Sequence, residues 1–410
     1  MARVKELAVW LHSEQVARLW RTGVARVSAE YASDVTDAYP VGTPLLSCSL
    51  PVRGGRQAAW PFVTGLLPEG HHRASMSMLA GVDTLDVLGM LARFGRDVAG
   101  AIVVAADDDR PATAHEAKVV DLTDGDLLAE VASLPARSLA LHDDSELSLA
   151  GLEDKMLLVR TAKGWGRPVH GYPSTHILKV DNRVHRGIVL AEHECLQLAR
   201  RAGLPAPGSE IVTVGDADCI VVERYDREIV RGAVTRVHQE DACQALGIDP
   251  AANDGRAKYE QYGGPTLGLI AGLLNAYAAD PPFELTRLLE RVTFTLVIGD
   301  ADAHGKNISL IHPDPLHVRL APLYDTVPTA LWPTLRPSTA MRINGRDRLP
   351  DISADDLVLE ARRWGMSERH ARATVADVCD RLREAAKSVS RRNGAALKKL
   401  VIANAQRLSK

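Results

Sequence analysis

The segment between residues 285 and 325 constrains this chain most, because it predicts a helix, a polar loop and a strand in direct succession. The loop reads Gly-Asp-Ala-Asp-Ala-His-Gly-Lys-Asn over residues 299–307, and a strand-like run follows at residues 308–312. A helix, a loop and a strand in this order suit a catalytic loop. Before the loop, apolar residues recur at helical spacing, at Leu285, Leu288, Leu289, Val292 and Leu296.

The polar residues of this segment have the spacing of a phosphoryl-transfer site. Asp302 is followed five residues later by Asn307, and Asp325 lies eighteen residues beyond. In protein kinases a catalytic-loop Asp accepts the proton of the attacking hydroxyl, an Asn five residues later holds a metal ion, and a later Asp holds it from the other side. Asn307 and Asp325 therefore suit Mg²⁺, and Lys306 would add a cation beside the phosphates.

Two other interpretations of this loop stay open on spacing alone. It is rich in turn-forming residues, so it is also typical of a polar loop without chemistry. A metal hydrolase with Asp302 and His304 as ligands is the second alternative. The chain has no second histidine cluster at ligand spacing, which weakens the hydrolase hypothesis.

Composition predicts a globular protein of roughly two or three domains, because the chain has 410 residues, 46% hydrophobic and 25% charged. Its net charge of −3 gives no overall attraction to nucleic acid. The five cysteines contain no Cys-x-x-Cys pair, so we expect a reducing cytoplasm rather than a zinc site or a disulfide framework. We expect no membrane span, because no apolar run approaches the roughly 20 residues required, and the run at residues 7–11 is too short for a signal peptide.

A second set of candidate residues lies between residues 175 and 205. Lys179 stands at the end of an alternating strand, and Glu192 lies in the first turn of a predicted helix that Gly203 and Pro205 end. A strand lysine that contacts phosphates and pairs with a helix glutamate is the arrangement of protein kinases. The alternatives are a solvent-facing lysine and a glutamate that only stabilises a helix N-terminus.

The stretch from Ser145 to Lys155 is a candidate phosphate-binding loop. Gly151 allows a close approach of backbone to phosphate, and Ser148 and Lys155 flank it. The chain contains neither Gly-x-Gly-x-x-Gly nor Gly-x-x-x-x-Gly-Lys-Ser/Thr, so neither standard phosphate loop is present. A flexible loop before a strand at residues 156–161 is the alternative.

The C-terminal region is locally basic, with nine Lys and Arg residues between residues 380 and 410 against Asp380 and Glu384. Such a region can contact the phosphate backbone of nucleic acid. A solvated helix face has the same composition, so contact with DNA stays a hypothesis.

The order of predicted elements gives the fold class α+β: a protein-kinase-like two-lobed fold, with a β-rich N-lobe and a helical C-lobe, and an extra N-terminal α+β module. The expected domains are this module at residues 1–106, a connection and helix at 107–140, the N-lobe at 141–227 and the C-lobe with the catalytic loop at 228–410. Asp83 is the predicted cap of a helix that ends near Gly95, and His238 is predicted to open another helix, whereas residues 338–349 are a loop of uncertain structure. Strands are predicted within residues 6–31 and at 101–105, 210–214 and 219–224, and further helices at 124–134, 266–279, 282–298, 353–364 and 367–389.

Motifs spread over nearly the whole chain resemble those of the HipA family of toxin kinases. Asp302-Ala-His-Gly-Lys-Asn and Leu323-Tyr-Asp carry the resemblance at the catalytic loop. Together with six others they make eight motifs in the right order, which is hard to obtain by chance. In chain order the others are Gly65-Leu-Leu-Pro-Glu-Gly, Leu147-Ser-Leu-Ala-Gly with Lys155, Thr175-His-Ile-Leu-Lys, Val222-Glu-Arg-Tyr-Asp-Arg, His238-Gln-Glu-Asp and Tyr262-Gly-Gly-Pro.

The resemblance implies a role for each candidate residue in a kinase that uses ATP and Mg²⁺. Asp302 would be the catalytic base, Asn307 and Asp325 the metal ligands, and Glu192 the ion-pair partner of Lys179. Residues 150–155 would cover the phosphates, residues 223–225 would be the hinge to adenine, and Asp226 would lie near the ribose. Ser148 would be the serine that the kinase phosphorylates in itself, which disorders its loop and stops activity. The nucleotide-binding set would be Ala150, Gly151, Leu152, Glu153, Asp154, Lys155, Lys179, Glu223, Arg224, Tyr225, Asp226, His304, Gly305, Lys306, Asn307 and Asp325.

The resemblance also implies partners. The protein substrate would be glutamyl-tRNA synthetase or a related aminoacyl-tRNA synthetase, and a HipB-like helix-turn-helix antitoxin would hold the kinase and bind operator DNA. One position departs from the family pattern, because Glu153 stands where the family often has Gln. Together with Asp154 it would repel ATP unless both side chains point outward. A weakly active co-repressor that binds operator DNA with its antitoxin is therefore an alternative function, and a small-molecule phosphotransferase is a third.

Overall fold

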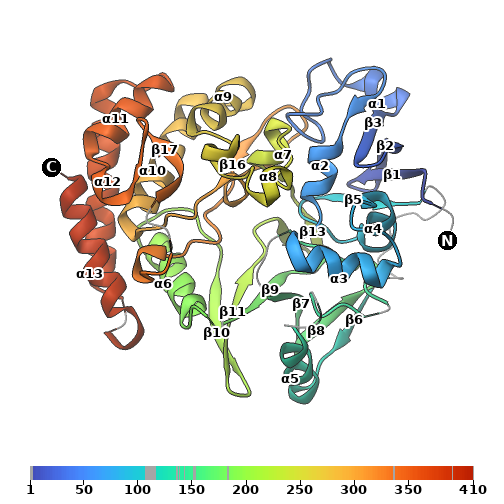
Figure 1. Cartoon of the computed structure of the whole chain (residues 1–410), viewed down its shortest axis with the longest axis horizontal. Helices are drawn as coiled ribbons and strands as arrows, with labels where there is room; N and C mark the ends of the chain where they lie inside the picture. The colour runs from blue at the N-terminus through green and yellow to red at the C-terminus, as the bar shows by residue number, and fades with distance from the viewer. Residues whose placement is uncertain are drawn as a thin grey trace.

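The computed structural model describes residues 3–106, 117–134, 137, 139–142, 144–150, 154–181, 184–335, 338–389 and 391–409, with no side chains for residues 391–393. The N-terminal strands lie at one end of the molecule, the C-terminal helices at the other, and a second sheet lies between them (Figure 1). Across the described ranges, no helix has the length and apolar character needed to cross a membrane.

The N-terminal module is a five-stranded antiparallel sheet with the strand order β4-β3-β2-β1-β5. Alternate residues such as Leu7, Val9 and Leu11 are buried in a core shared with Phe62 and Phe94, as expected for a sheet with one covered face. The strands predicted within residues 6–31 are confirmed. The elements are β1 (Glu6–Leu11), β2 (Glu14–Gly23), β3 (Arg26–Tyr31), α1 (Ser33–Ala38), β4 (Gln57–Ala58), α2 (Trp60–Gly65), α3 (Gly70–Ala80), α4 (Val87–Phe94) and β5 (Ile102–Ala105).

A six-stranded antiparallel sheet in the order β10-β11-β9-β7-β8-β6 forms the middle of the molecule. On one face, Ile220 and Val222 pack against Leu196 of α6. Lys179 lies opposite Ile220 in the register, so its side chain is on the face that α6 covers. The elements are β6 (Lys118–Asp121), α5 (Asp124–Ser133), β7 (Lys155–Thr161), β8 (Gly164–Val169), β9 (His176–Val180), α6 (Ile188–Arg201), β10 (Ser209–Val214) and β11 (Ala217–Glu223).

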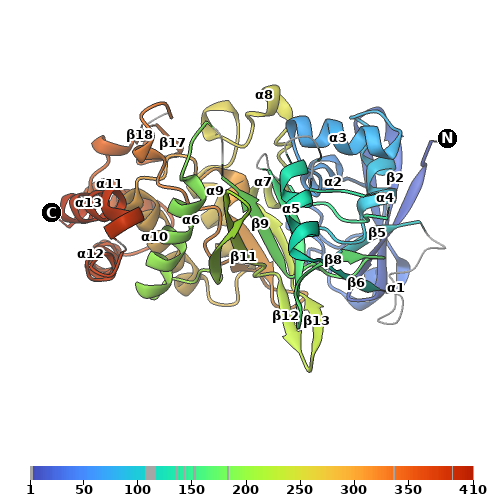
Figure 2. The same ribbon diagram turned by 90° about the horizontal axis from the view of Figure 1, so that it is seen from below.

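The C-terminal part packs around α10, in which Leu288, Leu289 and Val297 are fully buried. A hairpin, β12 (Arg227–Val230) and β13 (Ala233–Arg236), projects from the molecule (Figure 2). The other elements are β14 (His238–Asp241), α7 (Ala242–Leu246), α8 (Ala252–Gly255), a 3-10 turn (Glu260–Tyr262), α9 (Leu267–Tyr277), α10 (Pro281–Ile298), 3-10 turns (Gly305–Asn307 and Thr329–Leu331), β15 (Ser309–His312), β16 (Arg319–Leu320), β17 (Ser338–Ile343), β18 (Arg346–Arg348), a 3-10 turn (Leu349–Asp351), α11 (Ala354–Arg363), α12 (Glu368–Ala386) and α13 (Arg391–Leu408).

Two predicted helix starts are wrong by a few residues. Asp86, not Asp83, caps α4, because its side chain accepts a hydrogen bond from the Gly89 N–H. Helix α6 begins at Ile188, so Glu192 lies in its second turn rather than its first. The positive N-terminal end of α6 therefore contributes little to stabilising the Glu192 carboxylate.

Two other segments adopt strands that local patterns did not indicate. Residues 238–241 form β14 rather than the start of a helix, because they pair with β15, and α7 begins only after its N-cap, Asp241. The uncertain segment at residues 338–349 contains the hairpin of β17 and β18. In both places the strand partner, rather than local propensity, decides the structure.

Candidate active site

A cavity of about 360 Å³ lies where the N-terminal module, the middle sheet and the catalytic loop meet. The N-terminal module contributes Gly65, Glu69 and Ala99 to its lining. Of the predicted site residues, Gly151, Leu152 and Glu153 lie outside the described residues, and Ser148, Asp154 and Gly305 do not line the cavity. The predicted residues that line it are Ala150, Lys155, Lys179, Glu192, Glu223, Arg224, Tyr225, Asp226, Asp302, His304, Lys306, Asn307 and Asp325.

Lys179 connects the middle sheet to the loop that follows β16. Its Nζ lies 2.9 Å from Glu192 Oε1 and 2.7 Å from Asp325 Oδ1. Burial alone would raise the pKa of the Asp325 carboxyl, but the Lys179 ammonium outweighs it and lowers that pKa to about 2. Asp325 also has a left-handed φ of 53°, an unusual backbone conformation that often occurs at functional sites.

The catalytic loop leaves α10 at Gly299, whose φ of 76° is the left-handed conformation that ends helices. The Asn307 side-chain N–H₂ donates to the Asp302 carbonyl oxygen at 3.1 Å, and the Asp302 N–H donates to Asp300 Oδ1 at 2.8 Å. These bonds fix the backbone of the loop and leave the Asp302 side chain exposed. Burial, reinforced by the nearby Asp302 charge, raises the pKa of Asp300 well above its ordinary value.

The residues at this loop fit ATP with Mg²⁺. Because Asn307 uses its amide nitrogen within the loop, its side-chain oxygen is the atom suited to a metal, beside the ionised Asp325. One carboxylate and one amide oxygen, completed by phosphate oxygens, are a normal Mg²⁺ donor set. His304 Nδ1 is buried and has no hydrogen-bond partner among the described residues, and burial lowers the pKa of His304, which keeps its ring neutral at pH 7.

Lys306 is not a free cation beside the phosphates, as we expected from its place in the loop. Its Nζ lies 2.8 Å from Asp241 Oδ2 and 3.8 Å from Glu69 Oε1. Lys258 lies 3.0 Å from the other oxygen of Glu69. Burial opposes the charge of Lys306, but Asp241 and Glu69 outweigh it and raise the pKa of its ammonium. The catalytic loop is thus tied to the N-terminal module through buried charges.

The predicted hinge is anchored by its own backbone. The Glu223 N–H donates to the Gly208 carbonyl oxygen at 2.9 Å, and the Arg224 N–H donates to the Thr175 carbonyl oxygen at 2.9 Å. Two hinge donors are therefore already in use, and adenine would have to bind other backbone groups of this segment.

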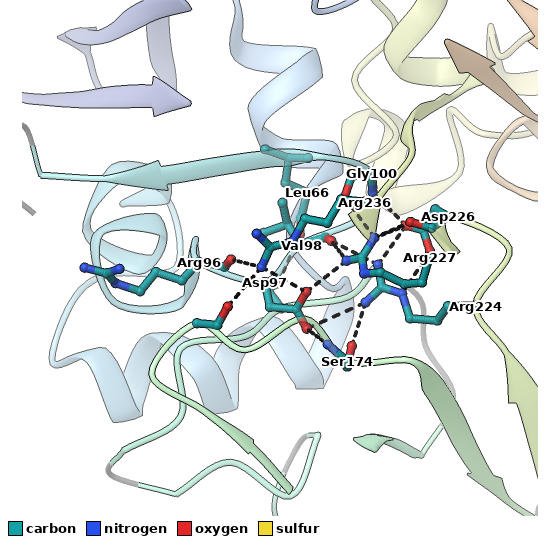
Figure 3. A network of polar contacts seen from close by, with 12 residues as sticks. Leu66, Arg96, Asp97, Val98, Gly100, Ser174, Arg224, Asp226, Arg227 and Arg236 are labelled. Atoms are coloured by element: carbon teal, nitrogen blue, oxygen red, sulfur yellow. Dashed lines mark hydrogen bonds and ion pairs between the residues drawn. The ribbon is translucent and has the colours of Figure 1, made fainter. Parts of the chain in front are cut away.

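The side chains of the hinge join the N-terminal module through a buried ion-pair network (Figure 3). Arg224 Nη2 lies 2.8 Å from Asp226 Oδ2, and Arg227 Nη2 lies 2.9 Å from Oδ1 of Asp97, which precedes β5. Asp226 Oδ2 also accepts a hydrogen bond from the Gly100 N–H at 2.8 Å. Burial opposes the charge of Asp226, but Arg224 and Arg227 outweigh it and lower its pKa. The Asp226 carboxylate is therefore held chiefly by arginines.

Ser148 lies behind the cavity wall rather than in it. It is fully buried, its Oγ donates to the Leu66 carbonyl oxygen at 3.0 Å, and its N–H donates to the Asp97 carbonyl oxygen at 2.9 Å. Asp154 approaches His72 at 3.8 Å, on the side of the N-terminal module. Its charge therefore does not face the cavity, which reduces the repulsion of ATP that the sequence suggested.

Sequence reasoning missed several cavity residues. Glu69 lies within the Gly-Leu-Leu-Pro-Glu-Gly motif, whereas Lys258 stands just before the Tyr-Gly-Gly-Pro motif, and the pairing of their charges was not apparent. Asp300 is the first Asp of Gly-Asp-Ala-Asp, and Tyr324 precedes the metal-site Asp. Tyr259 donates a hydrogen bond from its hydroxyl to Asp302 Oδ1 at 2.7 Å. Glu69 and Tyr324 lie within recognised motifs, and that position is the signal the sequence offered for them.

Two family descriptions match the chain in succession. Residues 7–105 match the HipA N-terminal domain, and residues 147–386 match the HipA-like C-terminal domain. The second match alone spans more than half of the chain.

Relatives with similar sequences cover most of the chain. The protein Y4mE of Sinorhizobium fredii, whose name describes it as a kinase, is 34% identical over 390 residues, which are 93% of this chain and 91% of that protein. The serine/threonine-protein kinase toxin HipA of Shewanella oneidensis is 27% identical over 296 residues, which are 69% of this chain and 66% of that protein.

A solved structure has the same fold. It contains HipA from Shewanella oneidensis MR-1 with HipB and operator DNA, and it matches with a TM-score of 0.81 at 23% identity over 98% of this chain and 97% of the other. The predicted α+β, kinase-like fold with an N-terminal sheet module is confirmed by this match.

Proposed function

The chain belongs to the HipA family of serine/threonine-protein kinases, and from that premise we propose that it transfers the γ-phosphate of ATP to a hydroxyl of a protein. The observation that carries this proposal is Lys179, which contacts both Glu192 and Asp325 in the wall of the cavity. A lysine held between a helix carboxylate and a metal-site carboxylate is placed to contact phosphate oxygens beside Mg²⁺.

The transfer requires one base and compensation of phosphate charge. Asp302 accepts the proton of the acceptor hydroxyl while that oxygen bonds to the γ-phosphorus; the bond from phosphorus to the bridging oxygen breaks, and ADP leaves. Asn307 and Asp325 would hold Mg²⁺, which neutralises phosphate charge when bound. Lys179 holds the phosphates in line, which is the larger part of catalysis in such sites.

Replacing Lys179 tests the nucleotide site. We expect Lys179→Met to weaken Mg-ATP binding about ten- to a hundredfold in calorimetry, because it removes a charge-assisted contact to phosphate. Lys163→Met is the matched control, since that side chain is 78% exposed and pairs with Asp121 outside the cavity. Equal affinities of the two variants would contradict the proposed site, and thermal unfolding of both identifies a loss caused by misfolding.

Self-phosphorylation at Ser148 is part of the proposal. The Ser148 hydroxyl donates to Leu66 and is fully buried, so it reaches the cavity only when its loop opens. A phosphate there cannot keep the hydrogen bond to the Leu66 carbonyl oxygen, because it brings negative charge to an acceptor in a buried site. The modified loop would stay open, and the cover of the phosphates would be lost.

The substrate and the assembly partners proposed for this chain have different support. An aminoacyl-tRNA synthetase, such as glutamyl-tRNA synthetase, is the proposed substrate, as the resemblance of the sequence motifs to the HipA family implies. A HipB-like antitoxin and operator DNA are the proposed assembly partners, because the solved Shewanella oneidensis complex contains HipB and operator DNA beside HipA. The co-repressor function is less favoured, because Asp154 lies beside His72 rather than in the cavity.

A further inference from the structure

Tyr259 contacts the catalytic loop but has no role in the mechanism above. Its hydroxyl donates a hydrogen bond to Asp302 Oδ1 at 2.7 Å. Its ring meets the His304 ring edge-on, with centroids 5.2 Å apart and planes at 86°. A half-buried tyrosine therefore holds one oxygen of the exposed carboxylate that is the proposed base.

The backbone beside Tyr259 is fixed to the same loop. The Lys258 carbonyl oxygen accepts a hydrogen bond from the Gly305 N–H at 3.0 Å. The Tyr-Gly-Gly-Pro turn closes tightly over this segment, since a Cβ on Gly264 would lie 2.7 Å from a backbone carbonyl oxygen. The Gly264 N–H also donates to the Tyr259 carbonyl oxygen at 3.0 Å. The tyrosine hydroxyl thus approaches Asp302 from a rigid support.

We propose that Tyr259 is a positioning residue for the catalytic base, an inference that rests on the proposed kinase function. A carboxylate accepts several hydrogen bonds, so a bond to Oδ1 fixes the rotation of Asp302 and leaves Oδ2 for the acceptor hydroxyl. Without it, an exposed Asp samples several rotamers, and fewer of them face the acceptor.

Tyr259→Phe is the variant that tests this role, because it removes the hydroxyl and keeps the ring against His304. Tyr262→Phe is the matched control, a tyrosine of the same turn whose ring contacts Arg256. The probe is Mg-ATP alone with the full chain. Phosphate incorporated into the chain is followed by intact mass against time at several ATP concentrations, which separates the maximal rate from the dependence on ATP.

The expected result is a maximal rate about three- to tenfold lower in Tyr259→Phe, the effect of one lost hydrogen bond. The ATP concentration for half-maximal rate stays unchanged. Tyr262→Phe behaves as wild type.

Two results overturn the inference while leaving the kinase function intact. One is a maximal rate identical to that of wild type. The other is a higher ATP concentration for half-maximal rate together with a lower unfolding temperature, because that pattern identifies a purely structural residue. A wild type that takes up no phosphate contradicts the proposed function itself, and Tyr259 then has no base to position.

Discussion

At the scale of single residues, the cavity wall carries paired charges that leave a net negative charge before any nucleotide binds. Lys179 contacts two carboxylates, those of Glu192 and Asp325, so the three side chains together carry one negative charge. A site with a net negative charge attracts Mg²⁺, and the metal then brings the phosphates. The low pKa of Asp325 keeps its carboxylate ionised at any physiological pH.

Asp325 should contribute a pH-dependent part of the folding stability. Its folded pKa of about 2 lies below the ordinary 3.8, so its pairing with Lys179 stabilises the fold above pH 3.8 and this stabilisation is lost as pH falls through about 2. We expect Asp325→Asn to lower the free energy of unfolding by about 1–2 kcal/mol at pH 7, and the difference from wild type to shrink between pH 4 and pH 2.

Urea unfolding at several pH values measures this difference. Asp254→Asn is the control, because that side chain is 92% exposed, and it should match wild type at every pH. A difference between wild type and Asp325→Asn that stays constant down to pH 2 would show that the pairing with Lys179 is not its source.

At the scale of elements, the segment between α2 and α3 reaches into the catalytic loop. Glu69 directly precedes α3, and its side chain is buried between Lys258 and Lys306. Burial would raise the pKa of Glu69, but Lys306 and Lys258 outweigh it and lower that pKa, so the carboxylate stays charged in the folded protein. The order of the catalytic loop thus depends on a residue of the N-terminal module.

Glu69→Gln should therefore destabilise the fold and slow phosphate transfer together. Loss of the carboxylate leaves part of the charge of two buried ammonium groups uncompensated, which we expect to cost about 2–3 kcal/mol of unfolding free energy. Calorimetric unfolding and the rate of phosphate uptake measure the two effects. Glu14→Gln, an exposed change in the same module, is the control. A free energy of unfolding of Glu69→Gln equal to that of wild type would show that the contact of Glu69 with the two lysines does not stabilise the fold.

Local patterns predicted the helix before the catalytic loop and the strand that carries Lys179, but not the contacts between distant segments. The helical repeat before residue 299 and the alternating strand at Lys179 are local, so α10 and β9 were predictable. Residues 238–241 form a strand only because β15 lies beside them. In the same way, Glu69 and Tyr259 reach the catalytic loop through packing that no spacing in the chain encodes.

At the scale of the whole molecule, the N-terminal module forms part of the site and is not a separate domain beside it. Asp97 lies at the centre of the network that reaches the hinge, with Arg224, Arg227 and Arg236 around it (Figure 3). The backbone beside Ser148 is bonded to the same aspartate. We therefore expect a change at Ser148 to affect the module and the hinge through these direct contacts.

Intact mass after incubation with Mg-ATP tests the proposed kinase function most directly, for wild type, Asp302→Asn, Ser148→Ala and the control Asp254→Asn. We predict that wild type and the control each gain one phosphate, and that Asp302→Asn and Ser148→Ala gain none. Equal uptake in wild type and Asp302→Asn would contradict the role of Asp302 as the base. A wild type that gains no phosphate, and carries none when purified, would contradict kinase activity and favour the co-repressor.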